Sequence, residues 1–213
     1  MASEPIRDPA KDRLLTPKNS AFVIIDYQPV QVNSIASMDR QLLLNNIVGC
    51  AKAAVAYGLP IVHSTVNVKT GLNKPPVPHI RKVLKEVPTV DRTSINSWED
   101  VEFRKAIEAT GRKKLIMTAL WTEACLTFPA IDALAEGYEV YVPVDAVGGT
   151  SLAAHEAALR RIEQAGAKLI SVVQLFCELQ RDWSRKETVP EFMNLFVETG
   201  GTAGIQFSYD RAE

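Results

Sequence analysis

Six short, mostly apolar runs alternate with longer amphipathic segments, and this alternation limits the possible folds more than any other feature. The runs lie at residues 21–25, 59–66, 89–93, 114–121, 138–144 and 168–173. The amphipathic segments predict helices at 40–57, 79–86, 99–110 (with Val101 and Phe103 or Ile107 facing inward), 122–136, 151–165, 174–183 and 189–197. Strand–helix alternation is typical of a parallel sheet with right-handed crossovers. We therefore predict a Rossmann-like α/β fold in three layers, α/β/α, with a mostly parallel six-stranded sheet.

The chain is expected to form one domain with a segment at each end. Residues 1–18 are charged and contain three prolines, which indicates an N-terminal arm. The alternating pattern fills residues 19–185, a length that one domain can hold. Residues 186–213 predict a C-terminal extension that packs on the domain or on a neighbouring subunit.

Composition excludes several classes of protein. The formal net charge is −1, which gives no support for nucleic-acid binding. No apolar run is long enough to span a bilayer, and the polar N-terminus lacks the apolar region of a signal peptide. Three cysteines, Cys50, Cys125 and Cys177, make a disulfide framework improbable. We expect a cytoplasmic protein.

Cys125 is the first candidate for chemistry. It lies where the fourth apolar run ends and the next predicted helix opens, and open α/β sheets place ligands at that point. Thr122 offers a hydroxyl to cap backbone N–H groups, and the helix dipole favours a thiolate. Pro129 means that the helix is kinked or begins only near Thr127. The alternative is that Cys125 is a buried core residue, as free cysteines commonly are.

Two further polar residues come at strand ends. Asp26 directly follows the first run, and Arg92 lies near the end of the third. Because the carboxyl ends of parallel strands share one edge of a sheet, both are expected near Cys125. Asp26 could instead serve only in a turn. His63, inside the second run, is expected to be a core or rim histidine.

Three segments in this order resemble a known family. They are VIIDYQ at 23–28, SINSW at 94–98 and WTEAC at 121–125. The combination resembles the isochorismatase-like cysteine hydrolases and looks closest to their YcaC-like branch. Segments 109–116, 128–130, 136–138 and 177–183 support that branch, and the resemblance covers about residues 18–185.

The resemblance implies an amidohydrolase-like enzyme that cleaves a small amide or related C–N bond through a thioester. Cys125 would be the nucleophile, and Asp26 the general base and acid. The family usually has a lysine as its third catalytic member. Here Arg92 is the best match, as a fixed cation, and Lys85 is the alternative.

The resemblance also implies a cis peptide bond at Leu120–Trp121 and an oxyanion hole formed by the backbone N–H groups of Trp121 and Cys125. Gln28, Trp121 and Phe128 are the expected substrate-pocket residues. Ordinary core packing is the alternative for Trp121 and Phe128.

No metal or other cofactor is expected. Metal-binding relatives carry an Asp-x-His pair after the second strand, whereas residues 63–67 read HSTVN, and His79 and His155 fall in predicted helices. The resemblance further implies a homo-oligomer, an octamer, with the N-terminal arm and the apolar stretch 192–197 as candidate contacts.

Two other functions stay open. A non-catalytic binding or assembly protein could use the same fold. A flavodoxin-like nucleotide or flavin module is disfavoured because no glycine-rich loop follows the first strand.

Overall fold

A six-stranded parallel sheet forms the centre of the protein. The computed structural model describes residues 7–199 and 201–210. The strands pair in the order β3-β2-β1-β4-β5-β6, and every pair is parallel. Their bounds are β1 Ser20–Ile25, β2 Ile61–Val66, β3 Thr89–Arg92, β4 Lys114–Ala119, β5 Glu139–Pro143 and β6 Lys168–Ile170. The predicted sheet is confirmed.

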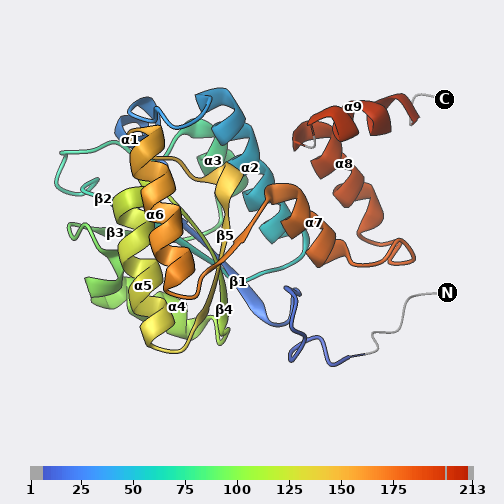
Figure 1. Ribbon diagram of the computed structural model, residues 1–213, viewed down its shortest axis with the longest axis horizontal. Helices are drawn as coiled ribbons and strands as arrows, with labels where there is room; N and C mark the ends of the chain where they lie inside the picture. Colours follow the sequence, from blue (N-terminus) through green and yellow to red (C-terminus); the bar gives the residue numbers. More distant parts are fainter. Residues whose placement is uncertain (1–6, 200, 211–213) are drawn as a thin grey trace.

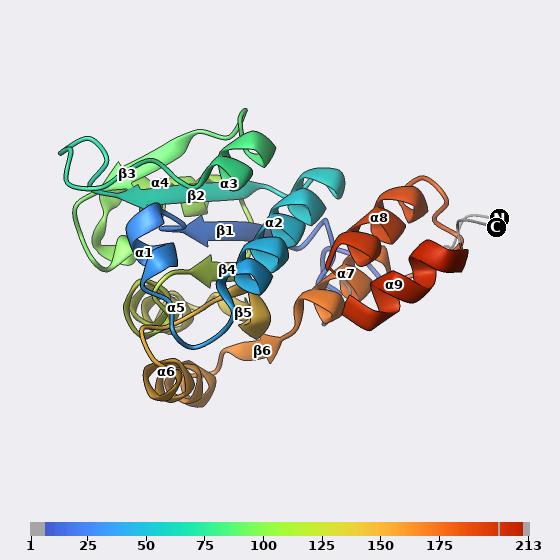
Figure 2. The same cartoon turned by 90° about the horizontal axis from the view of Figure 1, so that it is seen from above.

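Helices cover both faces of the sheet, which gives the three expected layers (Figure 1). One face carries α1 Pro29–Asn33, α2 Arg40–Ala56, α3 Pro78–Val83 and α7 Val172–Gln180. The other carries α4 Val101–Ala109, α5 Thr127–Ala135 and α6 Leu152–Gln164. Figure 2 shows the strands side by side between these two sets.

The alternation of side chains along β1 explains why both faces are covered. Phe22 and Ile24 point into the core under α2, where they pack with Leu43. Val23 and Ile25 point into the opposite core. All five side chains are fully buried, so β1 reads as a continuous apolar run rather than an alternating one.

One expected inward-facing side chain and one expected strand boundary were wrong, each for a local reason. Val101 is 63% exposed, because it is the first residue of α4, directly after the capping Asp100. Phe103 and Ile107 face the core as expected. The last strand ends at Ile170, and the residues after 171 belong to α7.

The capping of α7 explains that early end. The Ser171 hydroxyl accepts a hydrogen bond from the backbone N–H of Gln174, which starts the helix. Val172 and Val173, which were expected in the strand, therefore form the start of the helix.

The C-terminal segment forms two helices, α8 Val189–Thr199 and α9 Gly201–Asp210 (Figure 1). Phe192, Leu195 and Phe196 of α8 are buried in the same core as Phe176 of α7. The second helix, α9, was not predicted. Residues 211–213 of the predicted extension lie outside the described residues.

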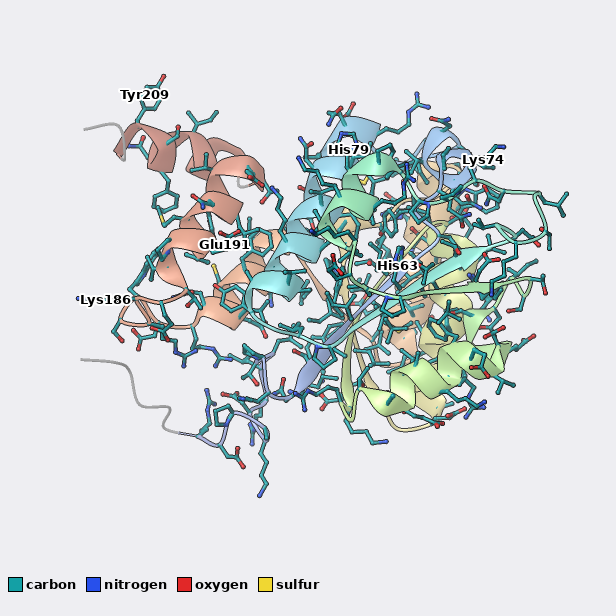
Figure 3. All side chains as sticks on the ribbon, turned by 180° about the vertical axis from the view of Figure 1, so that it is seen from behind. His63, Lys74, His79, Lys186, Glu191 and Tyr209 are labelled. Carbon is teal, nitrogen blue, oxygen red and sulfur yellow. The ribbon has the colours of Figure 1, made fainter. Side chains whose placement is uncertain are left out.

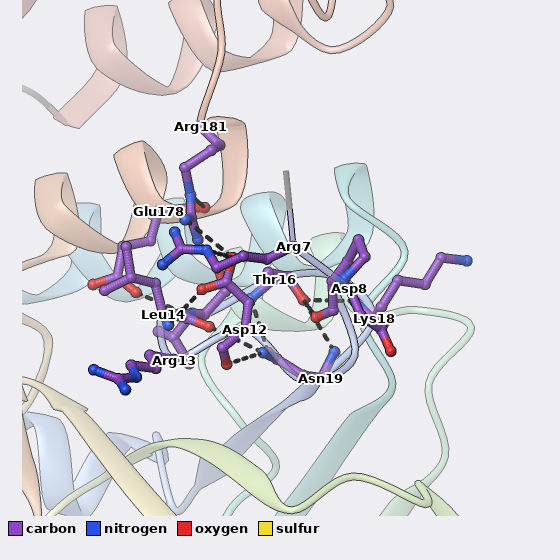
Figure 4. A network of polar contacts seen from close by, with 12 residues as sticks. Arg7, Asp8, Asp12, Arg13, Leu14, Thr16, Lys18, Asn19, Glu178 and Arg181 are labelled. Carbon is purple, nitrogen blue, oxygen red and sulfur yellow. Dashed lines mark hydrogen bonds and ion pairs between the residues drawn. The ribbon is translucent and has the colours of Figure 1, made fainter. Parts of the chain in front are cut away.

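The N-terminal arm is held by polar contacts (Figure 4). The Asp12 carboxylate pairs with Arg7 at 3.5 Å and with Arg181 at 3.4 Å. The buried Lys114 ammonium donates to the backbone oxygens of Asp12 and Arg13 at 2.7 and 2.6 Å. These contacts fix the arm against β4 and α7. Residues 1–6 of the arm lie outside the described residues.

Candidate active site

A buried ion pair joins the ends of β1 and β3. Arg92 Nη1 donates to Asp26 Oδ1 at 2.8 Å, and Nη2 donates to Oδ2 at 2.7 Å. The Asp26 residue is 0% exposed and Arg92 is 2% exposed. Nη1 also donates to Ser64 Oγ at 3.2 Å and to the Thr65 carbonyl at 3.0 Å. This two-pronged geometry orients the carboxylate and satisfies most of the guanidinium.

The pair favours the charged form of the arginine. Burial alone lowers the pKa of Arg92, but the hydrogen bond and the negative charge of Asp26 outweigh it, so the pKa lies above its ordinary value. Arg92 therefore stays a cation and cannot donate a proton. Lys85, the alternative partner, instead lies 3.6 Å from Glu86 with its side chain largely exposed.

Asp26 has a backbone conformation that is rare for residues with a side chain. Its φ is +62°, and its N–H donates to the Ser64 carbonyl at 3.0 Å. A left-handed non-glycine residue costs of order 1 kcal/mol, and such residues cluster at functional sites. At this position the left-handed conformation accompanies the contact of the Asp26 carboxylate with Arg92.

Cys125 lies beside this pair, 7% exposed, in a π-helical turn that spans Thr122–Leu126. Burial raises the pKa of the thiol to about 12, together with the Asp26 charge and a hydrogen bond to Asp26. Arg92 and the backbone N–H of Trp121 oppose this rise. The expected preference for a thiolate is therefore reversed, chiefly because burial disfavours the charged form and also because the Asp26 carboxylate adds to that effect.

The role expected for Thr122 was also wrong. Thr122 caps no N–H group; it opens the π-helical turn, and its hydroxyl pairs with His155 Nδ1 at 2.9 Å. Its carbonyl accepts a hydrogen bond from the Thr127 hydroxyl at 2.6 Å. The α-helix begins at Thr127, so Pro129 falls in its first turn, where no backbone bond is lost.

The peptide bond between Leu120 and Trp121 is cis, as expected. The Trp121 backbone N–H lowers the pKa of the Cys125 thiol, and the indole Nε1 donates to Ser34 Oγ at 2.6 Å. The Trp121 side chain is thereby tied to the end of α1.

The two other expected pocket residues take different positions. Gln28 is fully buried and bridges two backbone segments: its Nε2 donates to the carbonyls of Val66 and Lys74, and its Oε1 accepts from the Val66 N–H. Its amide therefore holds the loop at 67–77. Phe128 is 36% exposed on the first turn of α5.

The histidines are dispersed. His63 lies in β2, His79 in α3 and His155 in α6. Within residues 7–199 and 201–210, no group of three or more His, Cys, Asp or Glu side chains is arranged to hold a metal ion.

Two contacts at the site carried no signal in the sequence. Ser64 supports Arg92 from β2, the strand between the partners, and His155 supports the π-helical turn from α6. Both depend on side chains that only the folded sheet brings together.

No described helix combines the length and apolarity that a bilayer crossing requires.

Comparison with known proteins shows the family of this chain. The isochorismatase domain model matches residues 20–174. A probable hydrolase, YcaC, from Escherichia coli (strain K12) is 31% identical over 193 residues, 86% of this chain and 92% of the relative.

Two solved structures are similar over nearly their whole length. One is the E. coli YcaC gene product, described as an octameric hydrolase of unknown specificity, with a TM-score of 0.87, 30% identity, and 99% of this chain and 100% of that chain covered. The other is YcaC from Pseudomonas aeruginosa, solved with hexane-2,5-diol and covalent acrylamide, with a TM-score of 0.85, 30% identity, and coverage of 93% and 98%. The chain therefore belongs to the isochorismatase family, as a hydrolase of its YcaC-like branch.

Proposed function

We propose that the protein hydrolyses a small amide or related C–N bond through a thioester on Cys125. The observation that carries this proposal is the buried Asp26–Arg92 pair beside a neutral, nearly enclosed thiol. A neutral thiol needs a base at the moment of attack, and the Asp26 carboxylate is the base within reach. Arg92 holds that carboxylate in place and offsets its charge.

The reaction proceeds in two halves. In the first, Asp26 takes the thiol proton while the sulfur of Cys125 bonds to the substrate carbonyl carbon. The backbone N–H groups of Trp121 and Cys125 stabilise the resulting oxyanion. Protonated Asp26 then gives its proton to the leaving nitrogen, the C–N bond breaks, and a thioester remains. In the second half, Asp26 takes a proton from water while the water oxygen attacks the thioester carbonyl carbon. The C–S bond then breaks, the acid is released, and Asp26 returns its proton to the Cys125 sulfur.

A relative supports the nucleophile. The P. aeruginosa YcaC structure contains covalent acrylamide, an electrophilic alkene of the kind that alkylates thiols. For this chain we assign the equivalent reactivity to Cys125. Trp121 and Phe128 would line the substrate pocket, and Gln28 would shape it through the loop that it holds.

The test is hydrolysis of a panel of small primary amides. The rate is measured from the ammonia that is released. Wild type is expected to be active. In Cys125→Ala and in Asp26→Asn the rate of hydrolysis should fall at least 1,000-fold, which is about the effect of removing a nucleophile or its base. Cys177→Ala is the matched control, because Cys177 is an exposed free cysteine outside the site. Activity that survives Cys125→Ala would contradict the mechanism. If wild type and Cys125→Ala were equally inert, the non-catalytic binding or assembly function would be favoured.

We also propose that the protein is a homo-octamer, because the E. coli relative is described as octameric. Exposed apolar side chains on α9, Ile205 and Tyr209, are candidate contacts. Light scattering that gave a monomeric mass would reject the octamer. Three free cysteines, Cys50, Cys125 and Cys177, support our proposal of a reducing compartment, the cytoplasm.

A further inference from the structure

A cavity lies at the β2–β3 edge of the sheet, on the face opposite the Cys125 site. Its volume is about 480 Å³, within the range of small-molecule pockets. The two sites lie on opposite faces because successive side chains of a β-strand point to opposite sides of the sheet. His63 and Asp91 line this cavity, whereas their strand neighbours Ser64 and Arg92 point to the other face. Figure 3, viewed from behind, labels His63 and also His79 of α3 on this side.

The walls of this edge cavity are largely apolar. They come from the loop after β2, from α3 and from the segment before β3. The apolar wall residues are Val68, Pro75, Pro76, Leu84 and Val87. Two of these residues are prolines, whose rings fix the backbone φ angle, so this part of the wall is preformed. An occupant therefore needs an apolar body.

The charges of the edge cavity are unbalanced. Three cations line it, Lys69, Arg81 and Lys85, against the single lining carboxylate of Asp91. Glu86, which does not line the cavity, pairs with Lys85 at 3.6 Å, so two lining cations remain in excess of the nearby carboxylates. That carboxylate is already bonded: it accepts hydrogen bonds from the Thr65 hydroxyl at 2.8 Å and from the backbone N–H groups of residues 68 and 69 at 3.0 and 2.8 Å. The surplus positive charge favours an anionic group on the occupant.

A neutral histidine completes the lining of the edge cavity. His63 is 4% exposed, and its Nδ1 pairs with the Thr89 hydroxyl at 3.2 Å. Burial lowers the pKa of His63 to about 4, so the ring is neutral at pH 7. Within the described part of the chain, no hydrogen bond reaches its Nε2. Nε2 is not among the enclosed side-chain atoms that lack a partner, so we take it to be open to the cavity, where it can form one hydrogen bond with a ligand.

From these features we propose that the edge cavity is a binding site for a small organic anion with an apolar or aromatic body and one carboxylate or sulfonate. The apolar body lies against the proline wall. The anionic group lies between Arg81 and Lys85, and His63 Nε2 meets a polar atom of the body.

The probe for this site is 8-anilinonaphthalene-1-sulfonate, an aromatic sulfonate whose fluorescence rises in apolar surroundings. Wild-type protein in its native assembly is titrated with the dye at low ionic strength. N-phenyl-1-naphthylamine has the same ring system without the sulfonate. Its affinity therefore reports what the apolar contacts alone contribute to binding. The sulfonate is expected to bind about tenfold more tightly than the neutral dye, and the difference is expected to shrink with added salt.

Three variants localise the dye. Arg81→Gln/Lys85→Gln should weaken sulfonate binding about tenfold and leave the neutral dye unchanged. Lys74→Gln/Lys82→Gln removes the same charge from residues that do not line the cavity, and should change either affinity less than about twofold. Thr89→Trp fills the cavity from the exposed strand edge and should abolish specific binding of both dyes.

Three results would overturn the proposal: no saturable sulfonate binding to wild type, equal weakening in both double variants, or undiminished binding in Thr89→Trp. Circular dichroism and Cys125 alkylation verify that each variant is folded with an intact catalytic site. The catalytic proposal does not enter this test, because binding is measured without substrate.

Discussion

Replacing Asp26 by Asn should make the Cys125 thiol more acidic while it destroys hydrolysis. This pairing of effects separates the proposed site from an ordinary cysteine near a helix start. In the structure, burial and Asp26 together raise the pKa of Cys125 to about 12, against opposing contributions from Arg92 and the Trp121 N–H. Asparagine keeps the size of the side chain and removes the negative charge, so Arg92 then acts on the thiolate unopposed.

The size of the change follows from Coulomb's law. One charge at about 4 Å in a medium of effective dielectric near 20 contributes about 4 kcal/mol, or about three pKa units. The pKa of Cys125 in the variant should therefore fall to about 9. Near pH 7.5 the thiolate fraction rises about 1,000-fold, while each thiolate becomes less nucleophilic, so alkylation should be about 40-fold faster.

The assay measures the rate at which iodoacetamide alkylates Cys125 between pH 6 and 10 in wild type and in Asp26→Asn. Intact mass gives the extent of alkylation, and peptide mapping identifies the alkylated cysteine. Cys177, which is exposed, is the internal reference thiol. Because the variant leaves Arg92 buried without its anion, it should lose about 3–5 kcal/mol of stability, and thermal unfolding must show that it is folded at the assay temperature. Alkylation of Cys125 that is unchanged or slower in the folded variant would refute the reasoning.

Three further predictions concern the supports of the fold and the site. Arg92→Gln should lower the free energy of unfolding in urea by about 3–5 kcal/mol, because it leaves the fully buried Asp26 carboxylate unpaired; a loss below about 1 kcal/mol would contradict this. His63 is neutral when folded and its pKa is lowered to about 4, so the unfolded chain binds more protons below about pH 6.5 and the protein loses stability as the pH falls from there toward 4. The loss should reach roughly 3 kcal/mol at pH 4.5 and be absent in His63→Gln; identical slopes would refute it. Gln28→Leu removes three hydrogen bonds, two to Val66 at the end of β2 and one to Lys74 in the loop that follows. Trypsin should therefore cleave after Lys69 in that loop about tenfold faster than in wild type, whereas an unchanged rate would rule out this support.

Much of the fold was predictable because strand and helix periods differ along the chain. The proximity of Asp26 and Arg92 was predictable as well, since the carboxyl ends of parallel strands meet at one edge. The two-pronged contact between them follows from β2, which lies between their strands and supplies Ser64. No pattern in the sequence specifies that third partner.

The state of Cys125 was not predictable from its position. Its place at a strand end near a helix start predicted a thiolate, but the sulfur lies beside a carboxylate and is almost enclosed. The carboxylate belongs to Asp26, about 100 positions earlier in the chain. The π-helical turn likewise depends on His155, which only tertiary packing brings to Thr122.

Helix α9 shows how packing can override local preference. Its sequence contains two glycines and reads as a poor helix. In the structure α9 approaches α8 so closely that a Cβ atom at Gly204 would lie 2.2 Å from the Phe196 carbonyl oxygen. Phe207 packs edge-on against Phe196 at 5.6 Å between ring centroids. This close contact, which glycine permits, stabilises a helix that the sequence pattern did not indicate.

The central claim is a thioester on Cys125, and the most direct measurement is intact-mass spectrometry of the protein quenched in acid during turnover of an active amide. We predict a mass increase equal to the acyl half of that amide, located by peptide mapping on Cys125 and absent in Cys125→Ala. Turnover of the same amide without any acyl adduct, at an equal rate in wild type and Cys125→Ala, would contradict the account.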